Sequence, residues 1–310
     1  MSTYFCQHAS KGISFRTGLI VLFPLLITIT CCVSSAGTAD GELPKFNLAD
    51  HSVSAIEDYF NHWFDRVDKA LAEQPQWITP VVTVSPTLTE GIRYDQLWQH
   101  TGTNSSLVNF GAGKGLELIP AERVEAFIQV PPYEQRWGSQ HKQGIADWPF
   151  FFIKYQFARG NEQHGNYAVT GFLQATAPVG ISTFTSHYFG VTPTLAFGKG
   201  FGDFDVQMTI GDAFPIGNVH KVGAPLLWNT VFQYRVLKDF WPEIEFNTTY
   251  FPNGPFAGKT QVFMTPGLLI GKLPIYGRLK LAVGVGYQFP ISEQHPQFNS
   301  GWVLSVRLPF

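Results

Sequence analysis

The chain has 310 residues and a formal net charge of −2, so it offers no electrostatic basis for binding nucleic acid. Its mean hydropathy of +0.01 excludes a bundle of membrane helices. Aromatic residues make up 15% of the chain and charged residues only 14%, a ratio that is unusual for a soluble protein. A β-barrel reconciles these figures, because half of its strand residues face lipid and half face water.

The first 36 residues have the pattern of a cleaved signal peptide, which predicts export. Lys11 and Arg16 precede an apolar run over residues 18–29, and Ser34-Ser35-Ala36 supplies a small-residue cleavage site. A membrane anchor is disfavoured because the run is short and contains a proline. A lipoprotein signal is disfavoured because the residues before each candidate cysteine do not match one. All the cysteines lie in this segment, so the mature chain is expected to have no disulfide: Cys6, Cys31 and Cys32.

Residues 37–76 are predicted to form a periplasmic N-terminal segment with one helix over about residues 55–73. Ser54 to Glu57 has the form of a capping box, and Pro75 follows the expected end. The apolar positions fall on one stripe of the helix: Ile56, Tyr59, Phe60, Trp63, Phe64, Val67 and Leu71. We expect this stripe to pack on the periplasmic mouth of a barrel or on a partner. A plug inside the lumen and an interfacial helix on the inner leaflet are the alternatives.

From Trp77 to Phe310 the sequence alternates between apolar and polar residues, with Gly, Pro, Asn and Asp between the runs. We predict about twelve strands. They lie near residues 83–98, 107–119, 122–131, 148–159, 166–178, 187–199, 202–212, 225–238, 241–251, 260–271, 277–289 and 301–310. Long connections alternate with short ones, as in transmembrane barrels, which have long extracellular loops and short periplasmic turns. The fold class is therefore all-β, a transmembrane antiparallel up-and-down barrel.

One face of the clearest strands is aromatic or aliphatic, and the other carries polar and charged residues. This pattern suits a water-filled lumen better than a packed core. The candidate lumen-lining residues are the inward charges, which would select what passes: Lys154, Arg235, Glu243, Glu245, Lys280 and Arg307. Because Glu243 and Glu245 follow Arg235 across a short turn, we expect them to pair. The alternative for the whole set is an internal salt-bridge network that fills a narrow barrel without conducting.

The last ten residues form the clearest strand. Every second position back from the final residue is apolar: Trp302, Leu304, Val306, Leu308 and Phe310. This strand resembles the C-terminal signal of bacterial outer-membrane barrels, whose last strand closes the barrel and ends on an aromatic residue. The resemblance implies a bacterial outer-membrane location, with outer-membrane lipid and the barrel-assembly machinery as partners.

Residues 79–92, Thr-Pro-Val-Val-Thr-Val-Ser-Pro-Thr-Leu-Thr-Glu-Gly-Ile, are followed by Gly-rich strand pairs and the aromatic terminus. Together these features resemble the barrel family labelled for the "MetA pathway of phenol degradation". The similarity covers roughly residues 77–310 and rests on the residue pattern of the strands, without an invariant motif. It implies an exported outer-membrane barrel that moves small, often hydrophobic, molecules.

We predict no catalytic, metal or cofactor site. His295 and Ser300 faintly resemble the His/Ser element of outer-membrane phospholipase A, but Pro296 lies between them, and a turn rich in Asn, Ser and Gly is favoured. The nine histidines show no metal-ligand spacing. The sequence thus predicts a porin or transporter, not an enzyme, that passes small, hydrophobic or aromatic solutes. An outer-membrane lipid hydrolase and a structural barrel with a closed lumen are the alternatives.

Overall fold

The computed structural model describes residues 48–102, 104–294 and 297–310. The chain divides into two units, Met1–Leu48 and Ala49–Phe310. The predicted signal peptide over residues 1–36 and the start of the predicted periplasmic segment lie outside the described residues. No helix within the described ranges is both long and apolar enough to cross a membrane.

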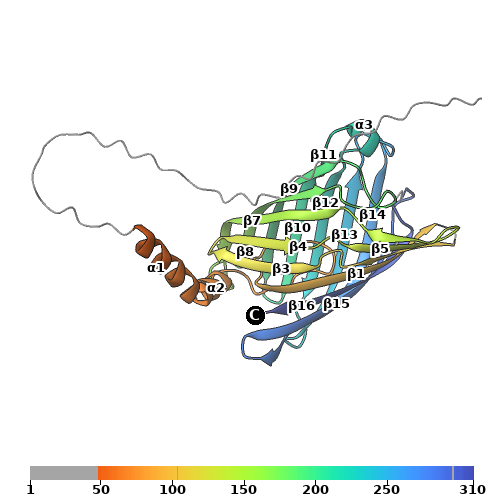
Figure 1. Cartoon of the computed structure of the whole chain (residues 1–310). Coiled ribbons are helices and arrows are strands. Elements are labelled where there is room, and N and C mark those ends of the chain that lie inside the picture. Colours follow the sequence, from red (N-terminus) through yellow and green to blue (C-terminus); the bar gives the residue numbers. More distant parts are fainter. Residues whose placement is uncertain (1–47, 103, 295–296) are drawn as a thin grey trace, which may run out of the picture. The chain divides into compact units, whose positions relative to one another are not determined.

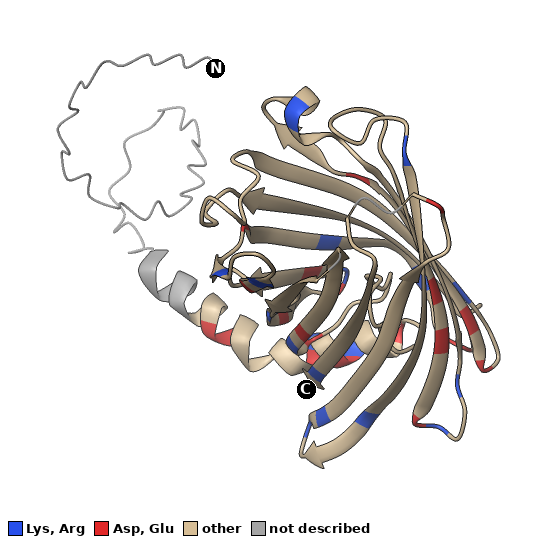
Figure 2. Ribbon diagram, turned by 90° about the vertical axis from the view of Figure 1, so that its right-hand side faces the viewer, with Lys and Arg blue, Asp and Glu red and all other residues tan. Residues whose placement is uncertain are grey.

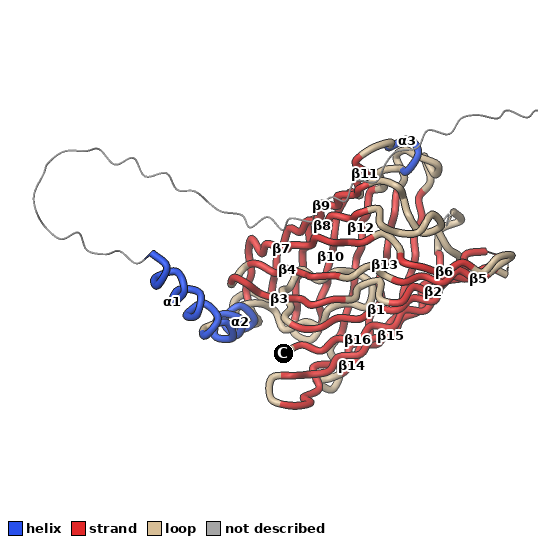
Figure 3. Tube along the Cα trace, viewed as in Figure 1, coloured by secondary structure: helices blue, strands red, loops and turns tan. Residues whose placement is uncertain are grey.

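The second unit is an antiparallel β-barrel, which its first and last strands close by pairing (Figure 1, Figure 3). Twelve strands form the closed circuit, as the sequence predicts. They are β1 (Gly91–Gly102), β3 (Gly115–Ala121), β4 (Val124–Gln129), β7 (Trp148–Gly160), β8 (Tyr167–Ala177), β9 (Phe189–Phe201), β10 (Phe204–Asp212), β12 (Leu226–Tyr234), β13 (Phe240–Tyr250), β14 (Thr260–Tyr276), β15 (Leu279–Pro290) and β16 (Ser300–Pro309).

Further strands extend the sheet where loops were expected. The remaining elements are β2 (Ser105–Phe110), β5 (Tyr133–Trp137), β6 (Lys142–Ile145), β11 (Phe214–Ile216) and the short helix α3 (Val219–Val222). β2 pairs with β1 and β5, and β5 pairs with β6. The predicted loop over residues 99–106 is therefore a tight hairpin, and the predicted loop over residues 132–147 contains paired strands. Hydrogen bonding between the strands satisfies the backbone of these segments.

The C-terminal strand closes the barrel, as predicted. β16 pairs with β15 on one side and with β1 on the other, in a register that runs from Gly91 opposite Pro309 to His100 opposite Ser300. Its alternation separates two faces, since Trp302 is 51% exposed whereas the neighbouring Val303 is 2% exposed. The strand therefore presents one face to the outside and one to the lumen.

The outer face of the barrel is apolar on strands from several parts of the circuit. Tyr155 on β7, Trp228 on β12 and Ile244 on β13 are 48%, 53% and 44% exposed. Charged residues occupy few positions along the strand ribbons (Figure 2). Residues next to these positions, such as Lys154 and Glu243, are buried, so the strands alternate between an outer and an inner face.

The first predicted strand, near residues 83–98, is wrong in its first half. Residues 77–90, which we call the inner segment, form no strand, and β1 starts at Gly91. The segment contains Pro80 and Pro86, which cannot donate to a strand ladder. Several of its other backbone groups find partners among side chains of the barrel wall. Alternation alone could not distinguish these two ways of satisfying an extended backbone.

The single predicted helix is two helices, α1 (Leu48–Asn61) and α2 (Trp63–Ala72), which meet at His62. Only α2 buries its apolar side. Val67 and Ala70 are 0% exposed and pack with Leu88 and Ile119, whereas Phe60 of α1 is 63% exposed. α2 packs against the barrel end that carries the short turns. The predicted placement of the helix at the periplasmic mouth stays a prediction.

Ion pairs fix α2 to three turns of the barrel. Asp68 binds Arg278 in the β14–β15 turn at 2.6 Å, and Lys69 binds Glu122 in the β3–β4 turn at 2.7 Å. Glu73, just after α2, binds Arg159 near the β7–β8 turn. The Arg278 guanidinium lowers the pKa of Asp68 below its usual value, and Arg159 lowers the pKa of Glu73. Both carboxylates are therefore stabilised in their charged form.

These pKa shifts predict that α2 is released in acid. A carboxylate with a lowered folded-state pKa contributes stability above its ordinary pKa of about 4 and loses that contribution as pH falls through the lower value. We expect hydrogen exchange in α2, corrected for its intrinsic pH dependence, to accelerate below about pH 4. In the D68N/E73Q double variant, α2 should exchange fast at neutral pH and lose this dependence. An unchanged acid response in the double variant would contradict the prediction.

Candidate functional site

The inner segment crosses the interior of the barrel. Its residues Ile78, Val81 and Ser85 are 2%, 1% and 0% exposed. Its hydrogen-bond partners belong to β4, β7, β8, β10, β13 and β16, which are spread around the circuit. A segment that binds the wall on opposite sides lies within the lumen. The candidate functional site is therefore the lumen together with this segment.

Two carboxylates of β13 bind the backbone of the inner segment. Glu245 accepts the N–H groups of Val82 and Thr83 at 2.7 and 2.8 Å. Glu243 accepts the N–H of Val81 at 3.0 Å. Alternation puts both glutamates on the inward face of β13, where Glu243 is 3% and Glu245 0% exposed. Consecutive amides that have no strand partner are thus satisfied by one strand of the wall.

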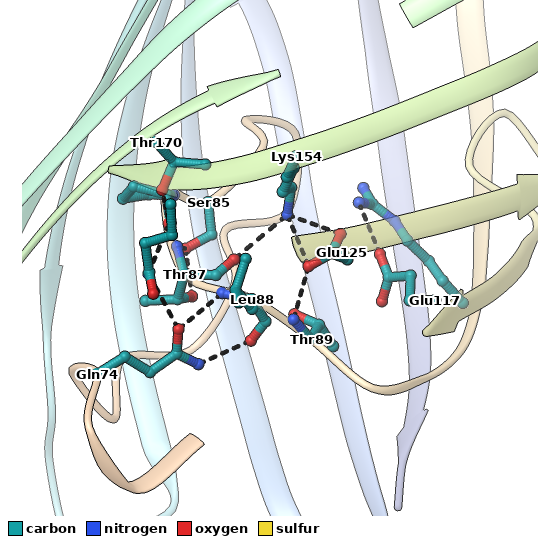
Figure 4. A network of polar contacts seen from close by, with 12 residues as sticks. Gln74, Ser85, Thr87, Leu88, Thr89, Glu117, Glu125, Lys154 and Thr170 are labelled. Atoms are coloured by element: carbon teal, nitrogen blue, oxygen red, sulfur yellow. Dashed lines mark hydrogen bonds and ion pairs between the residues drawn. The ribbon is translucent and has the colours of Figure 1, made fainter. Parts of the chain in front are cut away.

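A second set of contacts fixes the far part of the inner segment (Figure 4). Lys154 on β7 forms an ion pair with Glu125 on β4 at 2.9 Å and donates to the Thr87 carbonyl at 3.3 Å. Glu125 also accepts the Thr89 N–H at 2.6 Å. The ion pair is buried, and each partner also forms a hydrogen bond with the backbone of the inner segment. Lys154 therefore joins two wall strands and the segment in one network.

Amide and hydroxyl side chains complete this network (Figure 4). Gln74 binds Leu88 reciprocally, since its carbonyl accepts the Leu88 N–H and its amide donates to the Leu88 carbonyl, both at 2.8 Å. The Thr170 hydroxyl donates to the Pro86 carbonyl. Ser85 donates to Gln207 on β10 at 2.8 Å. These bonds hold residues 85–88 against β8 and β10.

Arg307 on the closing strand holds the other end of the inner segment. Its guanidinium donates to the carbonyls of Thr79 and Pro80 at 2.5 and 2.6 Å. Neighbouring Ser305 donates to Asp95 on β1 at 2.5 Å. The inward residues of β16 therefore link both the segment and the strand that closes the barrel.

Glycines on the lumen side make room for the inner segment. A Cβ atom at Gly198 on β9 would lie 2.3 Å from the Trp77 ring, and one at Gly284 on β15 would lie 2.9 Å from Val81. Both distances are shorter than real Cβ atoms essentially ever show. The wall is therefore shaped to the segment at these points as well as bonded to it.

Arg235 and Lys280 lie away from the inner segment's network. Arg235 follows β12 and pairs with Asp203 at 2.8 Å and Glu162 at 3.5 Å, both in neighbouring turns. The predicted pairing of Arg235 with the two β13 glutamates does not form. The carboxylate of Glu243 instead accepts hydrogen bonds from the Val81 N–H and the Gln233 amide. Lys280 is exposed at the barrel end that α2 covers.

Sequence reasoning missed several polar residues of the lumen. Arg93 pairs with Asp95 at 2.6 Å on β1, and Glu125 pairs with Lys154. Gln207 on β10 and Gln261 on β14 are further polar positions on the inward face. Strand alternation would have located all of these, because each lies on the buried face. Nothing in the sequence indicated that the inner segment would lie against them, since residues 77–90 alternate as a strand does.

The lumen retains open space beside the inner segment. A cavity of about 230 Å³ is lined by Val81, Arg93, Phe127, Lys154 and Val303. It combines apolar and charged walls, as small-molecule sites do. The arrangement can hold a small solute next to the segment and can block passage where the segment is bonded to the wall.

Metal binding and lipid hydrolysis are the other chemistries that were weighed from the sequence. Within the described ranges no cluster of His, Cys, Asp and Glu could hold a metal ion. His295 and Pro296 lie outside the described residues, and Ser300 begins β16. The hydrolase alternative therefore stays an untested prediction.

No protein-family model matches the chain, and no curated protein matches it. The resemblance to the MetA-pathway barrels thus stays a prediction. Several solved structures are similar. The COG4313 outer membrane channel from Pseudomonas putida F1 is 12% identical, with 76% of this chain and 100% of that chain covered and a TM-score of 0.49. The NanC porin is 10% identical, with 70% and 98% covered and a TM-score of 0.44.

The KdgM porin in complex with disordered oligogalacturonate is 14% identical, with 71% of this chain and 99% of that chain covered and a TM-score of 0.38. The closed barrel itself is established by the strand pairing of this chain, in which β1 bonds to β16.

Replacing Glu245 by alanine should loosen the inner segment. The change leaves the buried N–H groups of Val82 and Thr83 without their acceptor, at a cost of about 1–3 kcal/mol for each group. We expect faster hydrogen exchange at these amides, measured by mass spectrometry on the refolded protein. Substitution of the exposed Glu293 by alanine is the matched control and should leave this exchange unchanged. Equal protection in the two variants would show that Glu245 does not hold the segment.

Proposed function

We propose that this chain is a bacterial outer-membrane channel that passes small molecules through its lumen, and that the structure represents its closed state. The observation that carries this proposal is the contrast between the two faces of the wall. Trp228, Tyr234 and Trp302 are exposed on the outside, whereas Gln207, Gln233 and the β13 glutamates are buried inside. An apolar exterior and a polar lumen are what a membrane-spanning barrel requires.

This proposal includes the route to the membrane. Residues 1–36 would be removed after export, and residues 37–76 would stay in the periplasm with the helices. The closing strand, with Phe310 at its end, would be recognised by the barrel-assembly machinery. Outer-membrane lipid would then surround the exposed aromatic and aliphatic residues.

Passage requires the inner segment to move. While Glu243, Glu245 and Arg307 bind its backbone, residues 77–83 occupy the space between β13 and β16. Displacement would uncover the inward glutamine and glutamate side chains, which can replace part of a solute's hydration shell. The solutes would be small, and the resemblance to the MetA-pathway barrels favours hydrophobic or aromatic ones.

A structural barrel with a permanently closed lumen is the second candidate. It is favoured by the number of wall strands that bind the inner segment, from β4 to β16. The two candidates differ in whether the segment ever leaves the lumen, so a test must control its position.

A reversible crosslink tests the channel. The Thr83 hydroxyl accepts a hydrogen bond from the Asn247 amide at 3.2 Å, so a T83C/N247C variant places two thiols close together. The mature chain, without residues 1–36, has no other cysteine. We expect planar-bilayer conductance steps from the reduced variant and none from the oxidised one.

The single-cysteine variants T83C and N247C serve as controls and should conduct under both conditions. Steps that persist in the oxidised double variant would show that passage does not need the segment to move. If neither the wild type nor the reduced variant produces steps, the structural barrel is the correct alternative.

A further inference from the structure

A second cavity lies at the barrel end that α2 covers. It measures about 340 Å³ and lies between α2, the inner segment and strands β14, β15 and β16. Its apolar lining includes Leu71, Ile78 and Ala282. This volume falls at the small end of the range for small-molecule sites. The cavity is distinct from the one beside Lys154 in the lumen.

Charged side chains of both signs line this cavity, together with the last residue, Phe310. The cations are Lys272, Arg278, Lys280 and Arg307, and the carboxylates are Asp68, Glu90 and Glu117. Asp68 is already paired with Arg278 at 2.6 Å. Glu90 accepts the Trp63 indole N–H and the Ile119 N–H, both at 2.6 Å. Asp68 and Arg278 therefore offset each other, and Glu117 lies 3.9 Å from Arg93, which is not part of this lining. Among the described residues, Lys272, Lys280 and Arg307 form no ion pair with a carboxylate.

Lys280 is the most available of these cations. It shares the lumen-facing side of β15 with Ala282, Gly284 and Gly286. Within the described part of the chain its side chain has neither a hydrogen bond nor an ion pair. Lys272 lines the same cavity and carries the same charge. Two lysines that face the same cavity favour an anion between them.

The backbone of β14 is distorted in a way that directs Lys272 to this cavity. The pairing of β14 with β15 shifts register between Ile270 and Leu273, and Lys272 has a φ of 61°. This left-handed conformation is unfavourable for a lysine. Bulges of this kind redirect a side chain, and here the Lys272 ammonium donates to the Gln76 carbonyl at 2.9 Å. One bond leaves the ammonium with further donors for a ligand.

Arg307 adds a buried donor. It lines the same cavity and is 5% exposed. Its terminal nitrogens bind the Thr79 and Pro80 carbonyls, but its Nε atom is buried and has no partner among the described residues. An unpaired buried N–H is costly unless a ligand satisfies it.

We propose that this cavity binds a small monocarboxylate with an apolar body, whose carboxylate lies between Lys272 and Lys280 and whose body contacts Leu71 and Ile78. The inference rests on the proposed function and deepens it, because it names the charge class of solute that the channel concentrates at its helix-covered mouth.

Equilibrium binding tests this proposal without any need for transport. Benzoate, benzyl alcohol and benzylamine have similar size but negative, neutral and positive charge. Their affinities for the refolded mature protein would be measured by calorimetry in a non-ionic detergent. We expect benzoate to bind best and K280Q to weaken it about tenfold, the loss of one charge-assisted hydrogen bond. K280R, which retains the charge, should bind benzoate within a few-fold of the wild type.

The exposed Lys142 on β6 supplies the matched control, and K142Q should bind as the wild type does. Equal benzoate affinity in K280Q and wild type would overturn the proposal. So would benzyl alcohol binding as tightly as benzoate, because the cavity would then recognise only the apolar ring. Binding with no conductance would leave the site intact and reject the channel. Conductance with no benzoate binding would reject the site alone.

Discussion

The hydrogen bonds that Glu243 and Glu245 accept from the inner segment are the constraint on which the rest of the structure depends. A chain segment inside a barrel has no neighbouring strand, yet its buried N–H groups must be satisfied. The wall meets this need with side chains, carboxylates for Val81, Val82 and Thr83 and the guanidinium of Arg307 for two carbonyls. In the proposed channel, the polar lumen is therefore both the surface that a solute would meet and the surface that holds the inner segment in place.

The barrel, the helices and the segment form one connected system. The inner segment joins α2 to β1, so its position depends on both of its ends. Asp68 and Lys69 fix α2 to turns on separate strand pairs, and β1 is fixed by β16. A motion that opens the lumen must therefore release the contacts of the segment, while its two ends stay in place.

Most of the wall could be predicted from the sequence, because strand alternation reports directly on which side chains are buried. Trp228 and Tyr234 outside and Gln233 inside follow from period two alone. The inner segment could not, since Thr79 to Ile92 alternates as a strand does and only its long-range partners show otherwise. The same limit applies to Arg235, whose sequence neighbours suggested β13 but whose partners are the turn residues Asp203 and Glu162. Local patterns specify a face, and they do not specify a partner.

The glycines opposite Trp77 and Val81 carry a further consequence. Gly198 and Gly284 weaken their own strands, since glycine packs nothing and has high conformational freedom. At Gly198 the absence of a side chain makes room for Trp77 and Pro86 of the inner segment, and at Gly284 it makes room for Val81 and for Leu269 on β14. The shape of the wall is thus complementary to the segment at these glycines. If the segment left the lumen, shallow grooves would remain there. A displaced segment would find the same two grooves on its return, which would guide it back to a single register.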